Sequence, residues 1–459
     1  MQKKKEQAGG MSRRAFMGTG AAGAAAFMVV PRHVLGGAGY KAPSDMLNIA
    51  CVGVGGKGFS DISGIATDNI VALVDVDDTQ MARTLKRDDA ELKSKLQKAK
   101  KYRDFRVMLE KHKDDVDAIT VSTPDHTHAV IAMAAMQMGK HAFVQKPLTH
   151  SVSEARALAE AAKKYKVVTQ MGNQGHAGEG GRLVCEWIWD GAIGPVREVH
   201  CWTNRPIWPQ GVNAPKEIPT TPSTFDWDLW LGPAPYRPYH PAYAPFSWRG
   251  WWDFGTGALG DMGAHIFDHP YWALKLGLPT AVQASSTRFT KDSYPVAEKV
   301  HYEFAARENM PATTLTWYDG GLMPERPVEI EQGRKMGDSG GGCLFVGEKG
   351  ELMCSVYGRN PRIIPEAKMK EYKRPEKTIP RSPGIHQEWV AACKGEGETT
   401  SHFDYAARLT ETMMLGNVAV LMQSKNMKLE YDGEKMEFTN LPEANKHLTR
   451  EYRPGWGLS

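Results

Sequence analysis

A glycine-rich turn near the start of the chain restricts the possible folds more than any other feature. The letters GVGGKG occupy positions 53–58, at the end of an apolar run over 47–54 and at the start of a helix-like segment. A pyrophosphate needs a tight turn, close approach of the backbone and free amide groups at a helix N-terminus, and this arrangement supplies all three. We therefore predict a dinucleotide-binding turn with contacts from Gly53, Gly55, Gly56, Lys57 and Gly58. The alternative is a glycine-rich turn in an unrelated α/β protein.

Residues 46–171 alternate short apolar runs with helix-like segments. The apolar runs lie at 47–54, 70–76, 116–122, 141–145 and 167–171, and the clearest helix-like segments, rich in alanine, lie at 129–138 and 153–164. Continuous apolar strands separated by helices indicate a parallel sheet that is covered on both faces. The sequence therefore predicts an α/β fold that begins with a Rossmann dinucleotide-binding domain over 46–171.

The pattern changes after residue 171. A segment at about 202–252 is dense in Pro, Trp and Tyr, and later runs such as 281–289 and 300–304 resemble strands of an antiparallel sheet. Two helix-like segments follow at 385–393 and 405–422. We predict a second, α+β substrate-binding domain over 172–459 with a large, mostly antiparallel sheet.

Asp75 stands at the end of the second apolar run, about twenty residues after the glycine turn. A carboxylate at this position binds the ribose hydroxyls of adenosine and repels a 2′-phosphate. The sequence therefore favours NAD over NADP as the cofactor.

Polar residues also follow two later apolar runs, where α/β folds place their ligands. Thr123, Pro124 and His128 follow one run, and Gln145 and Lys146 follow the next. All five are predicted cofactor contacts. Lys146, fixed by the proline after it, is also placed to meet a substrate oxygen; a solitary surface lysine is the alternative.

Taken together, these motifs resemble the family of glucose-fructose oxidoreductase, inositol dehydrogenase and MocA (Gfo/Idh/MocA). The resemblance covers about 47–422 and includes the glycine turn, the 124–128 segment, and a Gln-Lys-Pro triplet at 145–147 that matches the family's Glu-Lys-Pro. The segment 257–265 matches the family's glycine-rich D-x-x-x-H motif. The resemblance implies hydride transfer between a nicotinamide cofactor and a sugar or polyol carbon. Gln145 departs from the family's Glu, which affects the expected affinity and release of the cofactor rather than the fold.

Carried onto this chain, the resemblance implies that Lys146 contacts cofactor and substrate and that Asp261 and His265 form the acid/base pair. Residues four apart on a helix share one face, and a histidine titrates near neutral pH. The alternative is that Asp261 caps the start of a helix and that His265 packs in the core.

Residues for the substrate are predicted at the junction of the two domains, where clefts usually lie. Asn173, Gln174 and His176 follow the last predicted Rossmann strand. Ten of the thirteen tryptophans lie between 187 and 272, among them Trp251, and aromatic faces stack on the C–H surfaces of sugars. We expect a small carbohydrate substrate, although most of these tryptophans are expected to pack in the core.

Residues 1–39 differ from the rest of the chain. Lysines at 3–5, a twin arginine at 13–14 and a weakly apolar stretch over 18–30 are typical of a Tat export signal, and the stretch is too short to span a membrane. The sequence therefore predicts engagement of the Tat machinery and a periplasmic location; a flexible basic tail or a short membrane anchor is the alternative. Without these residues the formal charge of +4 becomes −1, which gives no electrostatic case for nucleic acid.

The six cysteines do not resemble a zinc site, and no metal is predicted. In a periplasmic protein Cys343 and Cys354 are close enough in sequence to pair, but the sequence leaves this open. The resemblance also implies a homo-oligomer, formed through an exposed sheet of the rear domain.

Two other functions stay open beside the dehydrogenase. One is a glycoside hydrolase in which bound NAD transiently oxidises a sugar carbon and so permits elimination. Relatives of that kind carry a Tyr and His pair where this chain has Asp261 and His265, which favours net oxidation or reduction. The other is a non-catalytic sugar-binding protein, and the joint retention of Lys146, Asp261 and His265 argues against it. Gln145 and the export signal together suggest a cofactor that is held tightly through turnover.

Overall fold

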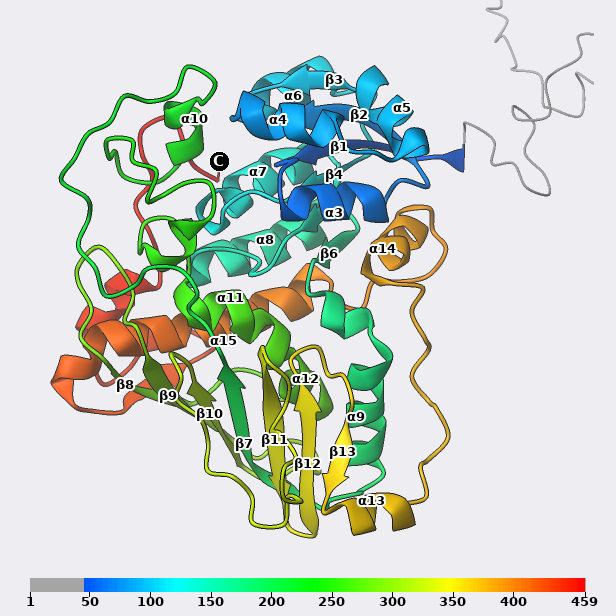
Figure 1. The fold of residues 1–459 in the computed structure, drawn as a ribbon, viewed down its shortest axis with the longest axis vertical. Helices are drawn as coiled ribbons and strands as arrows, with labels where there is room; N and C mark the ends of the chain where they lie inside the picture. The colour runs from blue at the N-terminus through cyan, green and yellow to red at the C-terminus, as the bar shows by residue number, and fades with distance from the viewer. Residues whose placement is uncertain (1–44, 459) are drawn as a thin grey trace, which may run out of the picture. The chain divides into compact units, whose positions relative to one another are not determined.

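A six-stranded parallel sheet forms the first part of the fold (Figure 1). The computed structural model describes residues 45–458, so the predicted export signal over 1–39 lies outside the described residues. The strands lie in the order β3-β2-β1-β4-β5-β6. Their bounds are β1 Asn48–Val52, β2 Asn69–Val74, β3 Lys100–Tyr102, β4 Ala118–Val121, β5 His141–Val144 and β6 Thr169–Met171. All neighbouring strands pair in parallel, which confirms the predicted Rossmann-type sheet.

Helices connect these strands, and several begin at side chains that cap them. Asp77, Asp89 and Asp104 each accept a main-chain N–H at the start of a helix, and Ser151 forms a reciprocal capping box with Glu154. The helices are α3 Lys57–Gly64, α4 Asp78–Leu85, α5 Ala90–Lys98, α6 Phe105–Lys111, α7 Asp125–Gln137 and α8 Val152–Tyr165. These polar caps fix the starts of α4, α5, α6 and α8.

The second part of the fold is a nine-stranded sheet in the order β13-β12-β11-β7-β10-β9-β8-β14-β15. Its strands are β7 Val196–Thr203, β8 Ala281–Ser286, β9 Glu298–Phe304, β10 Thr313–Tyr318, β11 Gly341–Gly347, β12 Gly350–Ser355, β13 Arg362–Ile364, β14 Leu429–Asp432 and β15 Glu437–Phe438. Only β7 and β10 pair in parallel among these described strands, which confirms a mostly antiparallel sheet. The remaining helices are α9 Glu179–Trp189, α10 Trp227–Leu231, α11 Gly257–Ile266, α12 Asp268–Ala273, α13 Glu366–Glu371, α14 Ile385–Cys393 and α15 Phe403–Met422, with short 3-10 turns at Gln174–Ala177, Ser247–Gly250, Gln423–Lys425 and Pro442–His447.

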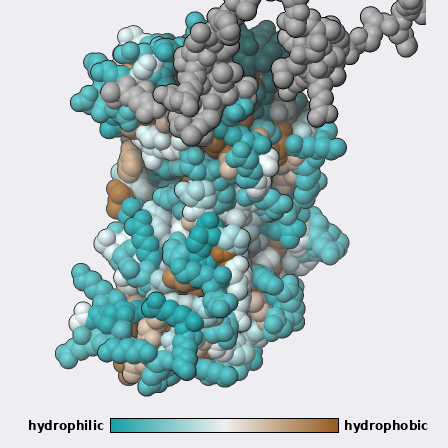
Figure 2. All heavy atoms as spheres, turned by 90° about the vertical axis from the view of Figure 1, so that its right-hand side faces the viewer, coloured by the Kyte–Doolittle hydropathy of each residue, from teal (hydrophilic) through white to brown (hydrophobic). Residues whose placement is uncertain are grey.

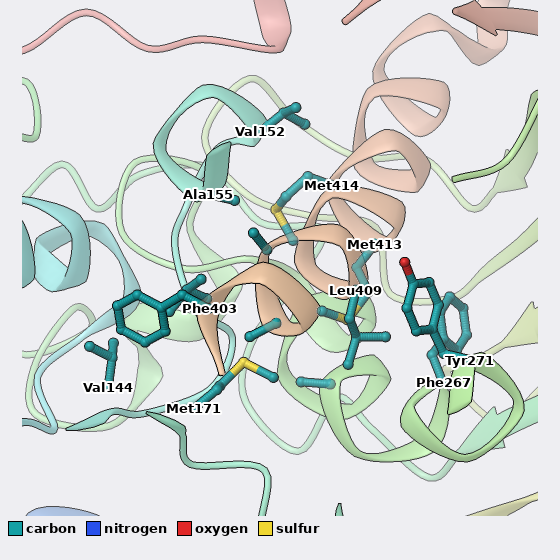
Figure 3. Close-up of a cluster of buried hydrophobic side chains, with 14 of the residues drawn as sticks. Val144, Val152, Ala155, Met171, Phe267, Tyr271, Phe403, Leu409, Met413 and Met414 are labelled. Atoms are coloured by element: carbon teal, nitrogen blue, oxygen red, sulfur yellow. The ribbon is translucent and has the colours of Figure 1, made fainter. Parts of the chain in front are cut away.

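The helix α15 joins the cores of the two sheets. It packs against α8 on one side and against β8 and β9 on the other, as the orange helix in Figure 1 shows. Phe403 and Leu409 of this helix lie in one buried cluster with Val144 of β5 and Phe267 (Figure 3). The apolar interior is therefore continuous across the fold.

The late helix α14 belongs to the interior of the first sheet, although it lies in the range predicted for the rear domain. Ile385 and Trp389 are buried in a cluster with Ile49 of β1 and Phe143 of β5. The ring of Trp389 meets that of Phe143 edge-on, with centroids 5.7 Å apart. A segment from the last fifth of the chain thus completes the packing below the glycine turn.

The segment rich in Pro, Trp and Tyr crosses from the second sheet to the first, and residues 204–256 are called the aromatic strap below. Its rings form a buried cluster of their own, centred on Trp227, Trp230 and Phe254. The main chain of the strap binds the chain after β2, because Asp226 donates its N–H to the Val76 carbonyl at 2.9 Å. The strap therefore covers the end of the sheet where the glycine turn lies.

Three cysteines stand side by side on the second sheet. Cys343 of β11 is opposite Cys201 of β7 and Cys354 of β12, and the Sγ atoms of Cys201 and Cys343 are 3.6 Å apart. All are buried free thiols, so the structure places Cys343 and Cys354 opposite each other without joining them.

The surface and the helices of the described part have two further properties. Within residues 45–458 no helix is both long and apolar enough to span a membrane, and no cluster of metal-binding side chains is found. On the face that Figure 2 shows, hydrophobic residues occur only in small patches among hydrophilic ones.

Candidate active site

A cavity of about 700 Å³ lies at the carboxyl ends of the Rossmann strands. Its walls come from the glycine turn, from residues 74–77 after β2, and from residues 122–125 after β4. Gln145 and Lys146 line it at the end of β5, and the strap closes the opposite side. This is the place where α/β folds bind their ligands.

The glycine turn leaves space that side chains would fill. Gly53 has a φ of +79°, and a Cβ there would lie 2.6 Å from the carbonyl oxygen of Ser122. A Cβ at Gly58 would overlap the carbonyl oxygen of Gly53. No side chain caps α3, although the N–H of Gly58 donates to the Gly55 carbonyl at 2.8 Å. The turn therefore fits a dinucleotide pyrophosphate.

Asp75 lines the cavity and also shapes the turn. Its Oδ2 accepts the N–H of Val54 at 3.0 Å, and its Oδ1 accepts the N–H of Asp77 at 3.0 Å. Burial raises the pKa of Asp75 to about 6, against the effect of these N–H groups. Asp75 therefore lines the cavity, and its contact with the adenosine ribose stays a prediction.

Gln145 lies over a buried carboxylate, Asp61, that the sequence did not single out. Its Nε2 donates to the two oxygens of Asp61 at 3.0 and 2.9 Å. Ser122 Oγ, Lys57 Nζ and His386 Nε2 also approach Asp61, at 2.7, 2.8 and 2.9 Å. A glutamate at 145 would place a second negative charge against this carboxylate, so the glutamine has a physical reason.

The surroundings of Asp61 keep it ionised. Burial alone would raise the pKa of this carboxyl, but the hydrogen bond from His386 and the charge of Lys57 hold it below its usual value. The side chain is fully buried under the turn. Asp61 therefore joins the glycine turn, β5 and α14 at one point.

Lys146 is fixed by Asp261 at the edge of the cavity. Its Nζ donates to Asp261 Oδ1 at 2.8 Å and to the Asp261 carbonyl at 2.7 Å. Arg249 donates to the same Oδ1 at 3.1 Å, and its guanidinium lies over the rings of Trp248 and Phe246, 4.2 and 4.9 Å from their centroids. The two cations hold the pKa of Asp261 well below its usual range in spite of burial. Asp261 is therefore an ionised positioning group rather than a helix cap, since α11 begins at Gly257.

His265 follows Asp261 by one helical turn and is only 4% exposed. Among the described residues its Nδ1 has no hydrogen-bond partner, and its ring meets that of Tyr357 edge-on at 4.9 Å. Burial and the charge of Lys146 hold the pKa of His265 well below its usual value. The imidazole is therefore neutral and able to accept a proton, and its catalytic role stays a prediction.

Asp125 is a second carboxyl of the cavity that the sequence reasoning missed. It begins α7 inside the 124–128 motif, and its Oδ2 accepts the hydroxyl of Thr256 at 2.7 Å. Burial raises its pKa to about 7, against the charges of Lys146 and Arg249. Its place in that motif was the signal available in the sequence.

The other predicted cofactor contacts divide into two groups. Thr123 and Pro124 line the cavity. His128 is fully buried, and its ring nitrogens lie 2.9 Å from the carbonyl oxygens of Thr123 and Pro147. His128 joins the two loops from behind and has no surface to offer a cofactor, which corrects the expectation of a direct contact.

The predicted substrate residues also divide. Asn173 is buried, and among the described residues neither its Nδ2 nor the Oε1 of Gln174 has a partner. His176 lies in the interior, 2.8 Å from Asp268 and stacked on Trp272. Trp251 is 2% exposed inside the strap and donates to the Ala242 carbonyl at 3.0 Å. His176 and Trp251 are therefore packing residues, because their polar atoms are satisfied inside the protein.

Known proteins resemble this chain over about a third of its length. Levoglucosan dehydrogenase of Pseudarthrobacter phenanthrenivorans is 27% identical over 155 residues, 34% of this chain and 32% of that protein. Alpha-N-acetylgalactosaminidase of Shewanella oneidensis is 28% identical over 156 residues, 33% of this chain and 34% of that protein. The chain thus spans about a third of the length of these relatives.

The fold resembles solved structures over most of the chain. The WlbA dehydrogenase of Bordetella pertussis, solved with NADH and UDP-GlcNAcA, has a TM-score of 0.57 at 14% identity, covering 84% of this chain and 99% of that one. At this identity the likeness shows the fold alone.

Two family models match the chain directly. The oxidoreductase family model of the NAD-binding Rossmann fold matches residues 47–173, and the model of the C-terminal alpha/beta domain matches residues 197–309. Together they cover more than half of the 459 residues. These matches, in line with the glycine turn and the Asp261 helix, show that the chain belongs to the Gfo/Idh/MocA oxidoreductase family.

Proposed function

We propose that the protein is an NAD-dependent oxidoreductase that oxidises or reduces a hydroxyl-bearing carbon of a sugar, polyol or glycoside. The observation that carries this proposal is Lys146, which Asp261 and the end of β5 hold between the glycine turn and His265. The family membership supports NAD, and the names of both relatives refer to carbohydrates.

The predicted site residues have different roles in this hydride transfer. The turn at 53–58 holds the pyrophosphate and Asp75 the adenosine ribose, while Lys146 orients the substrate hydroxyl. When bound, NAD supplies the nicotinamide that accepts or returns a hydride. His265 accepts the hydroxyl proton, which a neutral imidazole can do. Asp261 holds Lys146 in place by accepting a hydrogen bond from its Nζ.

A panel of sugars, polyols and glycosides tests this function. With NAD present we expect NADH absorbance to rise with at least one member of the panel, because oxidation of the substrate reduces the cofactor. Lys146→Ala is the matched control and should abolish the signal. Absence of NADH formation or consumption with every compound, by a protein shown to bind NAD, would contradict the proposal.

The matches to alpha-N-acetylgalactosaminidase favour a second candidate, glycoside hydrolysis through transient oxidation. Nitrophenyl glycosides in the same panel separate the two functions. Release of nitrophenol without net NADH formation would indicate the hydrolase, whereas NADH formation without nitrophenol indicates the dehydrogenase.

A tightly held cofactor is part of the proposal, and the strap supports it. Phe225, Trp230 and Tyr239 of the strap line the cavity opposite the glycine turn. Main-chain hydrogen bonds fasten the strap to the segment after β2, since Asp78 donates to the Thr224 carbonyl at 2.9 Å. Trp456 lines the far end of the cavity and lies against Phe105, with ring centroids 6.1 Å apart. A cofactor in this cavity leaves only if the strap moves.

We expect purified protein to retain NAD or NADH after dialysis, because the strap must open for release. Phe225→Ala removes one wall ring and should speed release about tenfold or more, the effect of about 1.4 kcal/mol. Tyr236→Ala is the control, since Tyr236 is 72% exposed and does not line the cavity. Bound nucleotide is measured by mass spectrometry and absorbance, and protein purified free of nucleotide would contradict tight retention.

Export is proposed on the twin arginine at 13–14 and the apolar stretch over 18–30, which support the Tat machinery as a partner and a periplasmic location. The family resemblance likewise supports a homo-oligomer through the second sheet.

A further inference from the structure

Arg359 lies beside Tyr357, whose ring packs against His265, and the charge of Arg205 acts on the same tyrosine. The guanidinium of Arg359 is 5.1 Å from the centroid of Tyr357. Arg205 follows β7, as Tyr357 follows β12, and its Nη1 donates to Asn204. Within residues 45–458 neither arginine forms an ion pair with a carboxylate, unlike Arg237, Arg249 and Arg381. Two positive charges are thus left without a fixed counter-charge next to the predicted base.

The charges of Arg205 and Arg359 both act on Tyr357. Burial raises the pKa of Tyr357 and Asp261 raises it further, whereas the charges of Arg205 and Arg359 oppose this rise. Asp338 is the other acidic group that acts on Tyr357, and its Oδ1 already accepts the N–H of Gly340 at 2.8 Å. The charges of both guanidinium groups therefore influence the Tyr357 hydroxyl.

Buried polar atoms without a hydrogen-bond partner lie next to Tyr357. Asn173 Nδ2, Gln174 Oε1 and His265 Nδ1 are buried and have no partner among the described residues. The turn that carries the first two packs on Tyr357, because a Cβ at Gly175 would lie 3.2 Å from the Tyr357 Cα. Buried polar atoms of this kind are rare and are commonly explained by a ligand or water that completes their hydrogen bonds.

Arg249, unlike Arg205 and Arg359, forms an ion pair with a carboxylate in the described part of the chain. It is bound to Asp261 and enclosed by the rings of Trp248 and Phe246. Its Nε donates to Asp261 Oδ1 and its Nη1 to the Phe246 carbonyl, so part of its donor set is already used. Among the described residues, the arginines that act on Tyr357 without a carboxylate partner are Arg205, which is half-buried, and Arg359, which is exposed.

We propose that Arg205, Tyr357 and Arg359, with the turn at 173–175, form a substrate subsite beside His265 for an acidic sugar. The anionic substituent binds the two guanidinium groups, whose paired N–H donors match a carboxylate. The sugar hydroxyls complete the hydrogen bonds of Asn173 and Gln174. This subsite rests on the proposed function, since His265 is the expected base for the reacting hydroxyl.

The test compares matched acidic and neutral sugars. Methyl glucuronide and methyl galacturonide are assayed against methyl glucoside and methyl galactoside, with glucose 6-sulfate added to distinguish a carboxylate from a sulfate ester. The wild-type protein is expected to prefer one acidic member by about tenfold or more in kcat/KM, as a charge-assisted hydrogen bond is worth about 1.5–3 kcal/mol. Arg205→Gln and Arg359→Gln should each remove most of that preference and change kcat/KM for the neutral partner less than about threefold.

Two control variants distinguish the loss of a positive charge from a general effect on folding. Arg205→Lys should keep part of the preference, and Arg288→Gln, an exposed position after β8, should keep all of it. Equal kcat/KM for acidic and neutral members, or equal loss of both in the Gln variants, would overturn the subsite and leave the proposed oxidoreductase intact.

Calorimetric binding of the methyl glycosides supplies a readout that does not need turnover. If no sugar is oxidised or hydrolysed, the proposed function fails, and binding alone then decides the subsite. Acid-selective binding that the Gln variants lose supports the subsite; binding with no preference for the acid, or no binding, rejects it.

Discussion

His265→Ala is expected to lower kcat by about 10²-fold or more, because the variant lacks the imidazole that takes the hydroxyl proton. Replacement by alanine should leave the cofactor site unchanged, since His265 does not line the main cavity. The measurement is kcat with the best substrate of the panel, alongside the NAD dissociation constant. A kcat equal to that of the wild-type protein would remove His265 from the mechanism.

The expected pH dependence of kcat in the wild-type protein follows from the burial of His265. Because the pKa of His265 lies well below the ordinary 6.5, the imidazole stays neutral as the pH falls through 6.5. The base function is therefore lost only at more acidic pH. The assignment would be contradicted if the kcat of the wild-type protein fell by half near pH 6.5. The same fall would have to be absent from a His265→Gln variant with residual activity.

Asp61→Ala is expected to destabilise the protein by about 3–5 kcal/mol, the range for removing one partner of a buried ion pair. The change leaves Lys57, His386 and the Gln145 amide without their common acceptor. Asp78→Ala is the control: its pair with Arg103 is about half exposed, and exposed pairs contribute about 0–1 kcal/mol. Urea unfolding measures both variants, and equal midpoints for the two would show that the Asp61 cluster carries no special stability.

The stability that Asp61 provides also has a defined pH range. Its folded-state pKa is lower than the ordinary 3.8, so the contribution is complete above that value. It is lost at more acidic pH, as the pH falls through the lowered folded-state pKa.

Local features made the first domain predictable. The apolar run at 47–54 and the glycines after it specify a strand and a turn from neighbouring residues alone. Lys146 and Asp261 were predicted separately through their motifs, although 115 residues separate them, and the structure joins them by a hydrogen bond.

Long-range contacts explain what the sequence did not reveal. Two of the partners of Asp61 are Gln145 and His386, which are 84 and 325 residues away, and no spacing rule connects such positions. Trp251 looked like a sugar contact because tryptophan suits both sugars and cores, and only the packing of the strap decides between them. His176 was misjudged for the same reason, since Asp268 and Trp272 that enclose it belong to another segment.

The position of α14 has a consequence for the order in which the protein matures. The sheet that carries the glycine turn is synthesised first, yet Ile385 and Trp389 fill its underside. Until the ribosome has released these residues, Ile49 and Phe143 face water. The nucleotide-binding half therefore acquires its finished packing only after α14 has been synthesised, and a truncated chain that ends after β6 would leave this apolar surface uncovered.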